Sequence, residues 1–297
     1  MFRIAGIINL NEGNMGNCKF CGKPVGLLRS KHPECEQQYL LNGRIKQEGI
    51  EKIVHSIESA IQSTGNFDDL EKTITEIEQS SGISPGARNE YLVKGWEKAV
   101  EQFLDDGIID ESEEKSLVNF TDYFSLPKEI LDGNGAWTKI VKAAVLRDIL
   151  NGIVPQRVNI EGSLPVNLQK NESIVWAFPR SEYLEDKTRR QFVGGSQGLS
   201  FKVAKGVYLR TGAFKGRSIE STERVKSDVG MVVITNKHIY FSGSVKSFRV
   251  PYSKIVSFEP FNNGIGIMRD AANAKAQIFV TGDGWFIYNL VTGLSRI

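Results

Sequence analysis

All three cysteines of this 297-residue chain, and one of its three histidines, fall within a single short segment: Cys18, Cys21, His32 and Cys35. The pairs C-x2-C and H-x2-C are separated by ten residues. This is the spacing with which a short segment surrounds tetrahedral zinc. Thiolates and a neutral imidazole suit this borderline-soft metal, and four protein donors leave no position for water. We therefore expect one structural zinc ion here.

The residues around the ligands predict the local fold. Gly22 suits the tight turn of a zinc knuckle, and Pro33 with Glu34 suits the first turn of a helix, where proline and an acid are both favourable. A knuckle, a hairpin and a helix make a treble-clef-like finger. Three buried free thiols are the alternative, and a disulfide would leave one thiol over.

Length and hydropathy restrict the protein class. A chain of 297 residues predicts about two domains. No run of eighteen apolar residues occurs, which argues against a membrane span. The apolar stretch from Met1 to Ile8 lacks a small-residue cleavage site, and Met15 is a possible natural start. We expect a cytoplasmic protein.

The charge is distributed unevenly although the net charge is only +2. Residues 15–56 carry seven Lys and Arg against four Asp and Glu, residues 57–135 carry six against eighteen, and residues 136–297 carry twenty-three against twelve. The net charges of these regions are therefore +3, −12 and +11. An acidic middle between basic ends indicates regions with different partners, or simply solvated helix faces.

Apolar residues recur at helical intervals after the zinc motif, from Ile50 to Ile61 and from Phe67 to Ile77. Ser84 before Pro85 predicts an N-cap and a helix that continues to Phe103. A last helix is expected from Trp137 to Leu150.

The acidic segment from Asp105 to Glu114 lacks the twelve-residue calcium-loop pattern. Asp110 and Glu113 are instead spaced as a capping box, and Gly107 ends the preceding helix. This D-G-I-x-D-x-x-E turn resembles the TerB-like helical family over residues 66–152.

From residue 158 onward the pattern changes to short β-type runs, which predicts an antiparallel barrel or sandwich. The predicted runs are Ile174–Trp176, Phe201–Leu209, Val229–Ile234, His238–Phe241, Phe248–Tyr252, Ile255–Phe258, Gly264–Met268, Ala276–Val280 and Trp285–Val291. The stretches GMVVITNKHIYFSG, FRVPYSKIVSFE and NGIGI resemble bacterial PH-like and GRAM-like domains over residues 200–297. The resemblance implies a binding scaffold and transfers no catalytic residue.

The expected fold class is therefore α+β and multidomain. We expect a treble-clef-like zinc finger over residues 1–48, an α-helical domain over residues 49–152, and an antiparallel β PH-like domain over residues 153–297.

The zinc end offers groups for single-stranded nucleic acid. The basic residues near the ligands are Lys19, Lys23, Arg29, Lys31, Arg44 and Lys46. Phe20 and Tyr39 are available for base stacking, while four glutamates dilute the charge. A zinc-stabilised protein-interaction module with ordinary surface lysines is an equal alternative.

RNA cleavage without a hydrolytic metal needs a proton acceptor and a cation beside the phosphate. The candidates are Arg29 or Lys31 for the phosphate and His55 or Glu34 as the base, because His32 is occupied if it binds zinc.

In the C-terminal region, seven basic residues are expected in loops, and anionic lipid is a candidate partner for them. They are Lys202, Lys205, Arg210, Lys215, Arg217, Arg224 and Lys226. The glycine-rich stretch from Val193 to Gly198 lacks the ending of a phosphate-binding loop, and His238 is expected to be packed or hydrogen-bonded.

The order zinc finger, helical region and PH-like domain is similar to that of the ring-activated zinc-finger ribonucleases of bacterial antiphage defence. This resemblance implies that the C-terminal domain senses a phage ring protein, that the chain forms a homo-oligomer, and that clustered zinc modules bind and cleave RNA. The alternative is a non-enzymatic adaptor whose PH-like domain binds protein or anionic lipid. A zinc hydrolase is disfavoured by the four protein ligands.

Overall fold

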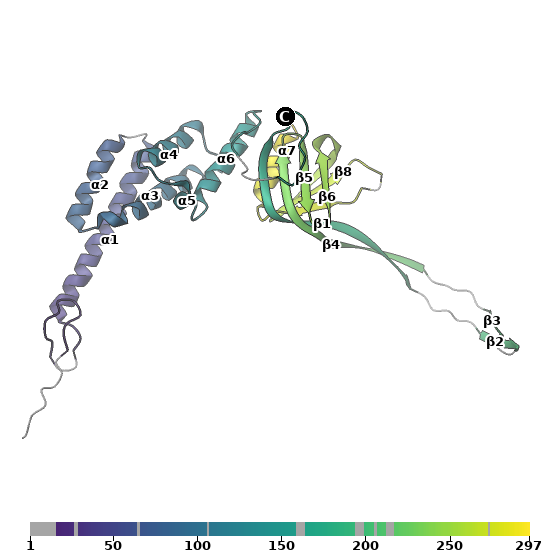
Figure 1. The fold of residues 1–297 in the computed structure, drawn as a ribbon, viewed down its shortest axis with the longest axis horizontal. Helices are drawn as coiled ribbons and strands as arrows, with labels where there is room; N and C mark the ends of the chain where they lie inside the picture. Colours follow the sequence, from purple (N-terminus) through teal and green to yellow (C-terminus); the bar gives the residue numbers. More distant parts are fainter. Residues whose placement is uncertain are drawn as a thin grey trace, which may run out of the picture. The chain divides into compact units, whose positions relative to one another are not determined.

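A computed structural model describes residues 16–26, 29–63, 66–105, 107–158, 164–193, 199–204, 207–211, 217–272 and 274–297. The chain divides into two compact units, residues 1–140 and residues 141–297. The first consists of helices that follow the zinc motif, and the second contains a sheet and a C-terminal helix (Figure 1). The chain is thus α+β, as predicted.

Among its described residues, the first unit contains five helices and one 3-10 turn. The boundary between the two units falls within a sixth helix. The elements are α1 (Pro33–Gln62), α2 (Phe67–Ser81), η1 (Pro85–Ala87), α3 (Arg88–Phe103), α4 (Glu111–Tyr123), α5 (Lys128–Leu131) and α6 (Ala136–Leu150). The predicted helices are present, and α1 runs without interruption from the second ligand pair through residue 48 into the bundle.

Only the C-terminal half of α1 is buried in this bundle. Its buried positions begin at Gly49 and continue through Ile53, Ile57 and Ile61, so one apolar stripe packs inward. Helices α2 and α3 both contact α1. A β-carbon added at Gly95 of α3 would lie 2.7 Å from Ile57, which shows how closely these helices approach.

The acidic turn before α4 has the predicted capping chemistry. The Asp110 carboxylate accepts a hydrogen bond from the Glu113 amide at 2.8 Å, and the Glu113 carboxylate accepts one from the Asp110 amide at 2.9 Å. Gly107 has a φ of +78°, the left-handed conformation that favours glycine. The capping box is confirmed.

The second unit is built on a seven-stranded sheet in the order β6-β5-β4-β1-β9-β8-β7, with antiparallel pairing throughout. Its strands are β1 (Ile174–Val193), β4 (Arg217–Thr235), β5 (His238–Gly243), β6 (Ser247–Pro251), β7 (Ile255–Phe261), β8 (Gly264–Arg269) and β9 (Gln277–Val280). The turn η2 (Tyr252–Lys254) joins β6 to β7. A separate two-stranded sheet pairs β2 (Leu199–Ala204) with β3 (Val207–Thr211).

The central hairpin of β1 and β4 is far longer than the sheet that it belongs to. The two strands pair from Ile174 with Thr235 to Val193 with Arg217. Strand β9 joins β1 only over Glu182–Glu185. The other strands of the sheet therefore flank only one end of the long ribbon that β1 and β4 form.

The core of the second unit lies between the sheet, helix α7 (Gly284–Leu294) and the end of α6. Aromatic rings pack at its centre, with Tyr183 and Phe241 5.2 Å apart between ring centroids and Tyr183 and Phe279 5.7 Å apart. Ile149 of α6 and Leu290 of α7 belong to the same cluster. Apolar burial on this scale is the main source of folding free energy.

The strand predicted for Trp285–Val291 is wrong, because this segment is helix α7. A short apolar run rich in aromatic and branched residues does not distinguish a strand from a buried helix. The deciding signals are the Asp283 side chain, which accepts from the Phe286 amide, and burial at Phe286, Ile287 and Leu290 while Trp285 remains 59% exposed. The predicted run Phe201–Leu209 is likewise two strands, β2 and β3.

None of the described helices combines the length and the hydropathy that crossing a membrane requires.

Candidate metal centre

The first ligand pair lies on a tight backbone turn. The Gly22 amide donates to the Cys18 carbonyl at 2.8 Å, and the Cys18 amide donates to the Lys23 carbonyl at 2.8 Å. Gly22 has a φ of +71°, so the predicted role of this glycine in the turn is confirmed. The two flanks of the turn meet in a bridge between Asn17 and Pro24.

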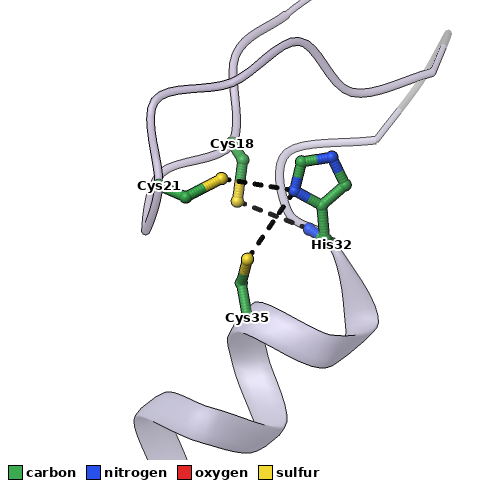
Figure 2. Close-up of side chains that lie close together, drawn as sticks. All are labelled: Cys18, Cys21, His32 and Cys35. Atoms are coloured by element: carbon green, nitrogen blue, oxygen red, sulfur yellow. Dashed lines mark hydrogen bonds between the residues drawn. The ribbon is translucent and has the colours of Figure 1, made fainter.

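The second pair comes from the start of α1. His32 is the N-cap residue of α1 with Pro33 at its first position, and Cys35 follows in the first turn. The backbone amide of His32 lies 3.4 Å from Cys18 Sγ, which connects the helix start to the first pair. The helix thereby presents two side chains toward the turn (Figure 2).

The four side chains lie close together in an arrangement that is compatible with a single structural zinc site. All four ligand atoms lie within 4.8 Å of one another. His32 Nδ1 is 3.4 Å from Cys21 Sγ and 3.7 Å from Cys35 Sγ. Zinc–sulfur and zinc–nitrogen bonds of ordinary length at a tetrahedral angle place two such ligand atoms about 3.6 Å apart. Four donors fill the tetrahedral shell.

The histidine is oriented by a partner outside the ligand set. His32 Nε2 lies 3.2 Å from the Pro24 carbonyl oxygen. Since a carbonyl only accepts, Nε2 carries the proton and Nδ1 presents its lone pair toward the sulfurs. Metal-binding histidines commonly have such a carbonyl partner, which fixes the ring orientation.

The thiols differ in acidity because they share one small space. Burial acts to raise the pKa of the Cys18 thiol, but hydrogen bonds from the amides of Cys21, His32 and Phe20 outweigh it and lower this pKa to about 6. Hydrogen bonding to Cys21, with burial, raises the pKa of the Cys35 thiol to about 11. The same Cys21 side chain raises the pKa of His32. A divalent cation would favour the ligating, deprotonated forms together.

The structure gathers some of the predicted RNA-binding residues around this centre. Lys19 and Lys23 are exposed on the turn, and Arg29 and Lys31 line a shallow hollow of about 330 Å³. Lys31 forms an ion pair with Glu36, so part of its charge is already compensated.

The remaining predicted residues are spread along α1. Glu34 is exposed in the first turn, whereas Arg44 and Lys46 lie nine and eleven residues beyond Cys35. His55 lies twenty residues beyond Cys35, about 30 Å at 1.5 Å per residue. The structure does not bring His55 together with Arg29, Lys31 and Glu34.

The two predicted stacking residues do lie together. The ring centroids of Phe20 and Tyr39 are 4.8 Å apart at an interplanar angle of 30°, and Lys19 Nζ is 4.8 Å from the centre of the Phe20 ring. Tyr39 is 62% exposed. We refer to the Phe20 and Tyr39 rings together as the aromatic step. This step, with Lys19 as an adjacent cation, lies beside the four ligands.

The basic residues predicted for C-terminal loops belong mainly to strands. Lys202 lies in β2 and Arg210 in β3, while Arg217, Arg224 and Lys226 lie in β4. Lys226 is paired with Glu182, and Arg224 lies 3.5 Å from Asp186. Lys205, Lys215 and residues 194–198 of the glycine-rich stretch lie outside the described residues.

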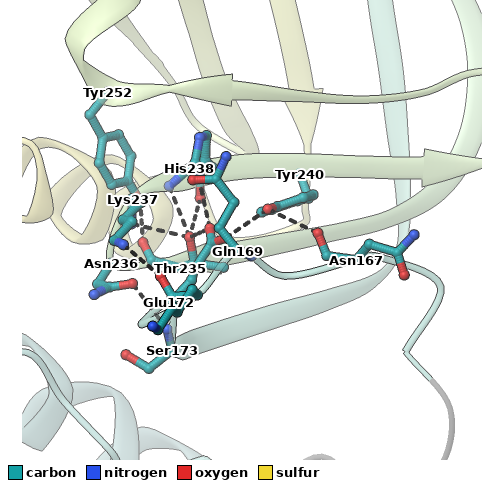
Figure 3. A network of polar contacts seen from close by, with 11 residues as sticks. Asn167, Gln169, Glu172, Ser173, Thr235, Asn236, Lys237, His238, Tyr240 and Tyr252 are labelled. Atoms are coloured by element: carbon teal, nitrogen blue, oxygen red, sulfur yellow. Dashed lines mark hydrogen bonds and ion pairs between the residues drawn. The ribbon is translucent and has the colours of Figure 1, made fainter.

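A buried polar network around Glu172 was not predicted (Figure 3). Its carboxylate has no exposed side-chain surface and accepts hydrogen bonds from Thr235 at 2.6 Å and Tyr240 at 2.8 Å. His238 Nδ1 lies 2.8 Å from the same carboxylate, which confirms the prediction of a hydrogen-bonded histidine. The amide of Gln169 donates at 2.7 Å.

Glu172 remains a carboxylate in this environment. Burial acts to raise its pKa, but hydrogen bonds from Thr235, the Gln169 amide, His238 and Tyr240 outweigh burial and lower the pKa to about 2. The network attaches the segment before β1 to the β4–β5 turn, where the Ser173 amide also donates to the Asn236 side chain at 3.0 Å. We interpret it as structural.

No protein-family model and no curated protein matches this sequence.

Proposed function

We propose that Cys18, Cys21, His32 and Cys35 bind one structural zinc ion, and that the treble-clef-like module around it binds single-stranded RNA. The observation that carries the RNA proposal is the aromatic step of Phe20 and Tyr39 directly beside the ligand cluster. Bases stack on exposed aromatic rings whatever their sequence, and nearby lysines contact phosphates. Lys19 supplies such a cation at the same step.

The second unit supports the proposal of a PH-like recognition domain. Its strands form two consecutive meanders, β4-β5-β6 and β7-β8-β9, and a C-terminal helix contacts β7 and β8. We propose that this domain recognises a phage protein assembly, as the similarity to ring-activated defence ribonucleases implies. Nothing in that role requires a catalytic residue in the sheet.

Assembly would then control RNA affinity through the number of zinc modules that one oligomer carries. A single small module with few cations binds RNA weakly, whereas modules held side by side on one oligomer bind a strand with a high effective concentration. We propose that the chain forms a homo-oligomer on its trigger and that RNA is bound, and then cleaved, in this state.

Cleavage would use groups at the start of α1. The 2′-oxygen attacks phosphorus while its proton passes to Glu34, and the bond to the 5′-oxygen breaks. That oxygen takes a proton from water, and the hydroxide left behind removes the proton from Glu34. Arg29 or Lys31 would stabilise the charge on the phosphate.

The zinc proposal is tested by substituting the histidine. His32→Cys gives a ligand set of four thiolates and is expected to retain one zinc per chain, whereas His32→Ala is expected to lose zinc and destabilise the module. Elemental analysis of the purified variants gives the metal content. Full zinc occupancy in His32→Ala would contradict the proposal.

The RNA proposal is tested by fluorescence anisotropy with single-stranded oligonucleotides. Tyr39→Ala removes one stacking face, and the expected loss is on the order of 1 to 3 kcal/mol of binding free energy. Trp285→Ala, which removes a 59% exposed aromatic ring from the second unit, serves as the control. Incubation of RNA with the chain and candidate phage ring proteins tests cleavage, and intact RNA in every assembled state would reject it.

A protein-binding adaptor is the second candidate, and the exposure of Leu40 (61%) and Leu41 (48%) on α1 favours it. This function predicts partner or liposome binding that continues after Tyr39→Ala.

A further inference from the structure

A groove lies between the exposed half of α1 and the C-terminal end of α2. Its volume is about 750 Å³, which is within the range of small-molecule binding sites. The lining residues are Tyr39, Leu40, Asn42, Gly43, Ile45, Lys46, Gln79, Ser80, Ser81 and Gly82. The groove forms because α2 ends at Ser81 while α1 continues for sixteen further residues toward the zinc ligands, with its buried positions starting only at Gly49.

The lining has the chemistry of a nucleotide site. The Gln79 amide and the Asn42 NH2 group offer hydrogen-bonding groups for base edges, while Asn42 Oδ1 already accepts from Gln38 at 2.8 Å. The Ser80 hydroxyl donates to the Ile77 carbonyl at 3.2 Å and keeps its acceptor lone pairs, and Ser81 adds a second hydroxyl. Lys46 offers a cation for phosphate. No carboxylate occurs among these described lining residues. The other hollow on α2, of about 610 Å³, contains Asp68, Glu71 and Glu76 and would repel phosphate.

Tyr39 connects this groove to the zinc module. Its ring packs against Phe20 and also lines the groove. A strand whose base stacks at the aromatic step can therefore continue along α1 into the groove without crossing acidic lining.

We propose that the groove binds a nucleotide of the same single-stranded RNA that the zinc module holds. The inference rests on the proposed RNA binding and extends it: the binding surface runs from Lys19 through Tyr39 to Lys46, rather than ending at the zinc ligands. Longer strands therefore bind more tightly than strands that reach only the aromatic step.

The test fills the groove without changing charge. A β-carbon added at Gly43 meets no atom within 4 Å, so Gly43→Leu obstructs the groove while leaving α1 intact. Leucine also favours helix more than glycine does, by up to about 1 kcal/mol. Gln37→Leu places the same side chain at an exposed position of α1 outside the groove, and is the matched control.

Anisotropy of the zinc-loaded full chain is measured with oligouridines of about four and about twelve nucleotides. Gly43→Leu is expected to weaken binding of the longer strand at least about five-fold, to leave the shorter strand unchanged, and Gln37→Leu to change neither. Unchanged binding of the longer strand by Gly43→Leu would overturn the groove site while leaving RNA binding by the zinc module in place. No binding of either strand by the unsubstituted chain would overturn both.

Cross-linking with 4-thiouridine provides an independent measurement. We expect cross-links at Tyr39 and at groove residues such as Asn42 or Gln79 with the longer strand. Cross-links confined to the zinc module with both strands would overturn the groove site.

Discussion

Glu172 is a fully buried carboxylate whose charge is stabilised by several donors at once. Thr235, His238 and Tyr240 come from the β4–β5 hairpin, more than sixty residues away in sequence. Removing one member of such a network leaves buried polar groups unpaired, which costs more than the hydrogen bond itself contributes. The stability of the second unit therefore depends on this residue.

We predict that Glu172→Gln destabilises the second unit at neutral pH by on the order of 3 kcal/mol. Because the folded-state pKa of Glu172 is about 2, below its ordinary value near 4.5, its contribution is fully present above about pH 4.5. The contribution is lost as pH falls toward 2. Urea unfolding followed by intrinsic tryptophan fluorescence, to which Trp176 and Trp285 of the second unit contribute, checks this.

The comparison is made at pH 7 and pH 3 against Glu259→Gln, which changes an exposed glutamate of β7. The difference in unfolding free energy between the Glu172 variant and the unsubstituted chain should narrow at the lower pH. An equal difference at both values would show that the charge of Glu172 is unimportant.

Residues with local partners were the predictable ones. Gly22 serves a turn closed within five residues, and Asp110 and Glu113 cap each other across one helical turn. The zinc ligands form two such local pairs. Glu172 gave no signal, because an isolated glutamate in a polar segment has the pattern of a surface residue until its distant partners are known.

At the scale of elements, two glycines of the helical bundle have opposite surroundings. Gly95 of α3 faces Ile57 of α1 so closely that an added β-carbon would lie 2.7 Å from its side chain. Gly43 of α1 faces open space. The same chemical change therefore has opposite consequences at the two positions.

We predict that Gly95→Ala destabilises the bundle by about 1 to 3 kcal/mol through overpacking, although alanine favours helix. Gly43→Ala should stabilise the same bundle by roughly 0.5 to 1 kcal/mol. Thermal unfolding followed by circular dichroism at 222 nm gives both values. A stabilising Gly95→Ala would mean that α1 and α3 do not cross this closely.

Helix periodicity predicted the bundle because each helix buries one stripe and exposes the rest. The same reasoning fails for α7, because Trp285–Val291 is apolar on most sides and its pattern predicts a strand. The extent of β1 and β4 was also not predictable, since residues 186–193 and 217–226 are mostly polar and pair only with each other among the described strands.

At the scale of the whole molecule, the proposed metal stabilises one small region. Among the described residues 16–26, the side chains buried around Gly22 are those of Cys18 and Val25, whereas the sheet of the second unit has an extensive apolar core. A segment with so little apolar burial depends on its ligands for stability.

We predict that chelation of zinc increases hydrogen exchange of residues 16–40 and leaves the amides of β4, β5 and β8 protected. Exchange followed by mass spectrometry, with and without a chelator, measures both regions in one sample. Protection that persists in residues 16–40 would mean that the metal is dispensable for folding. Loss of protection in the sheet would mean that the two units do not fold independently.

Because α1 is one continuous helix, the number of residues between the groove and the bundle decides in which direction the groove side chains point. Each residue rotates the helix by 100° and advances it by 1.5 Å. One extra residue inserted near Gln47 would leave every zinc ligand in place relative to the others, yet it would turn Tyr39 and Asn42 away from the end of α2. Four inserted residues would nearly restore their direction. Because four residues also advance the helix by about 6 Å, the groove depends on the exact number of residues between Tyr39 and Gly49.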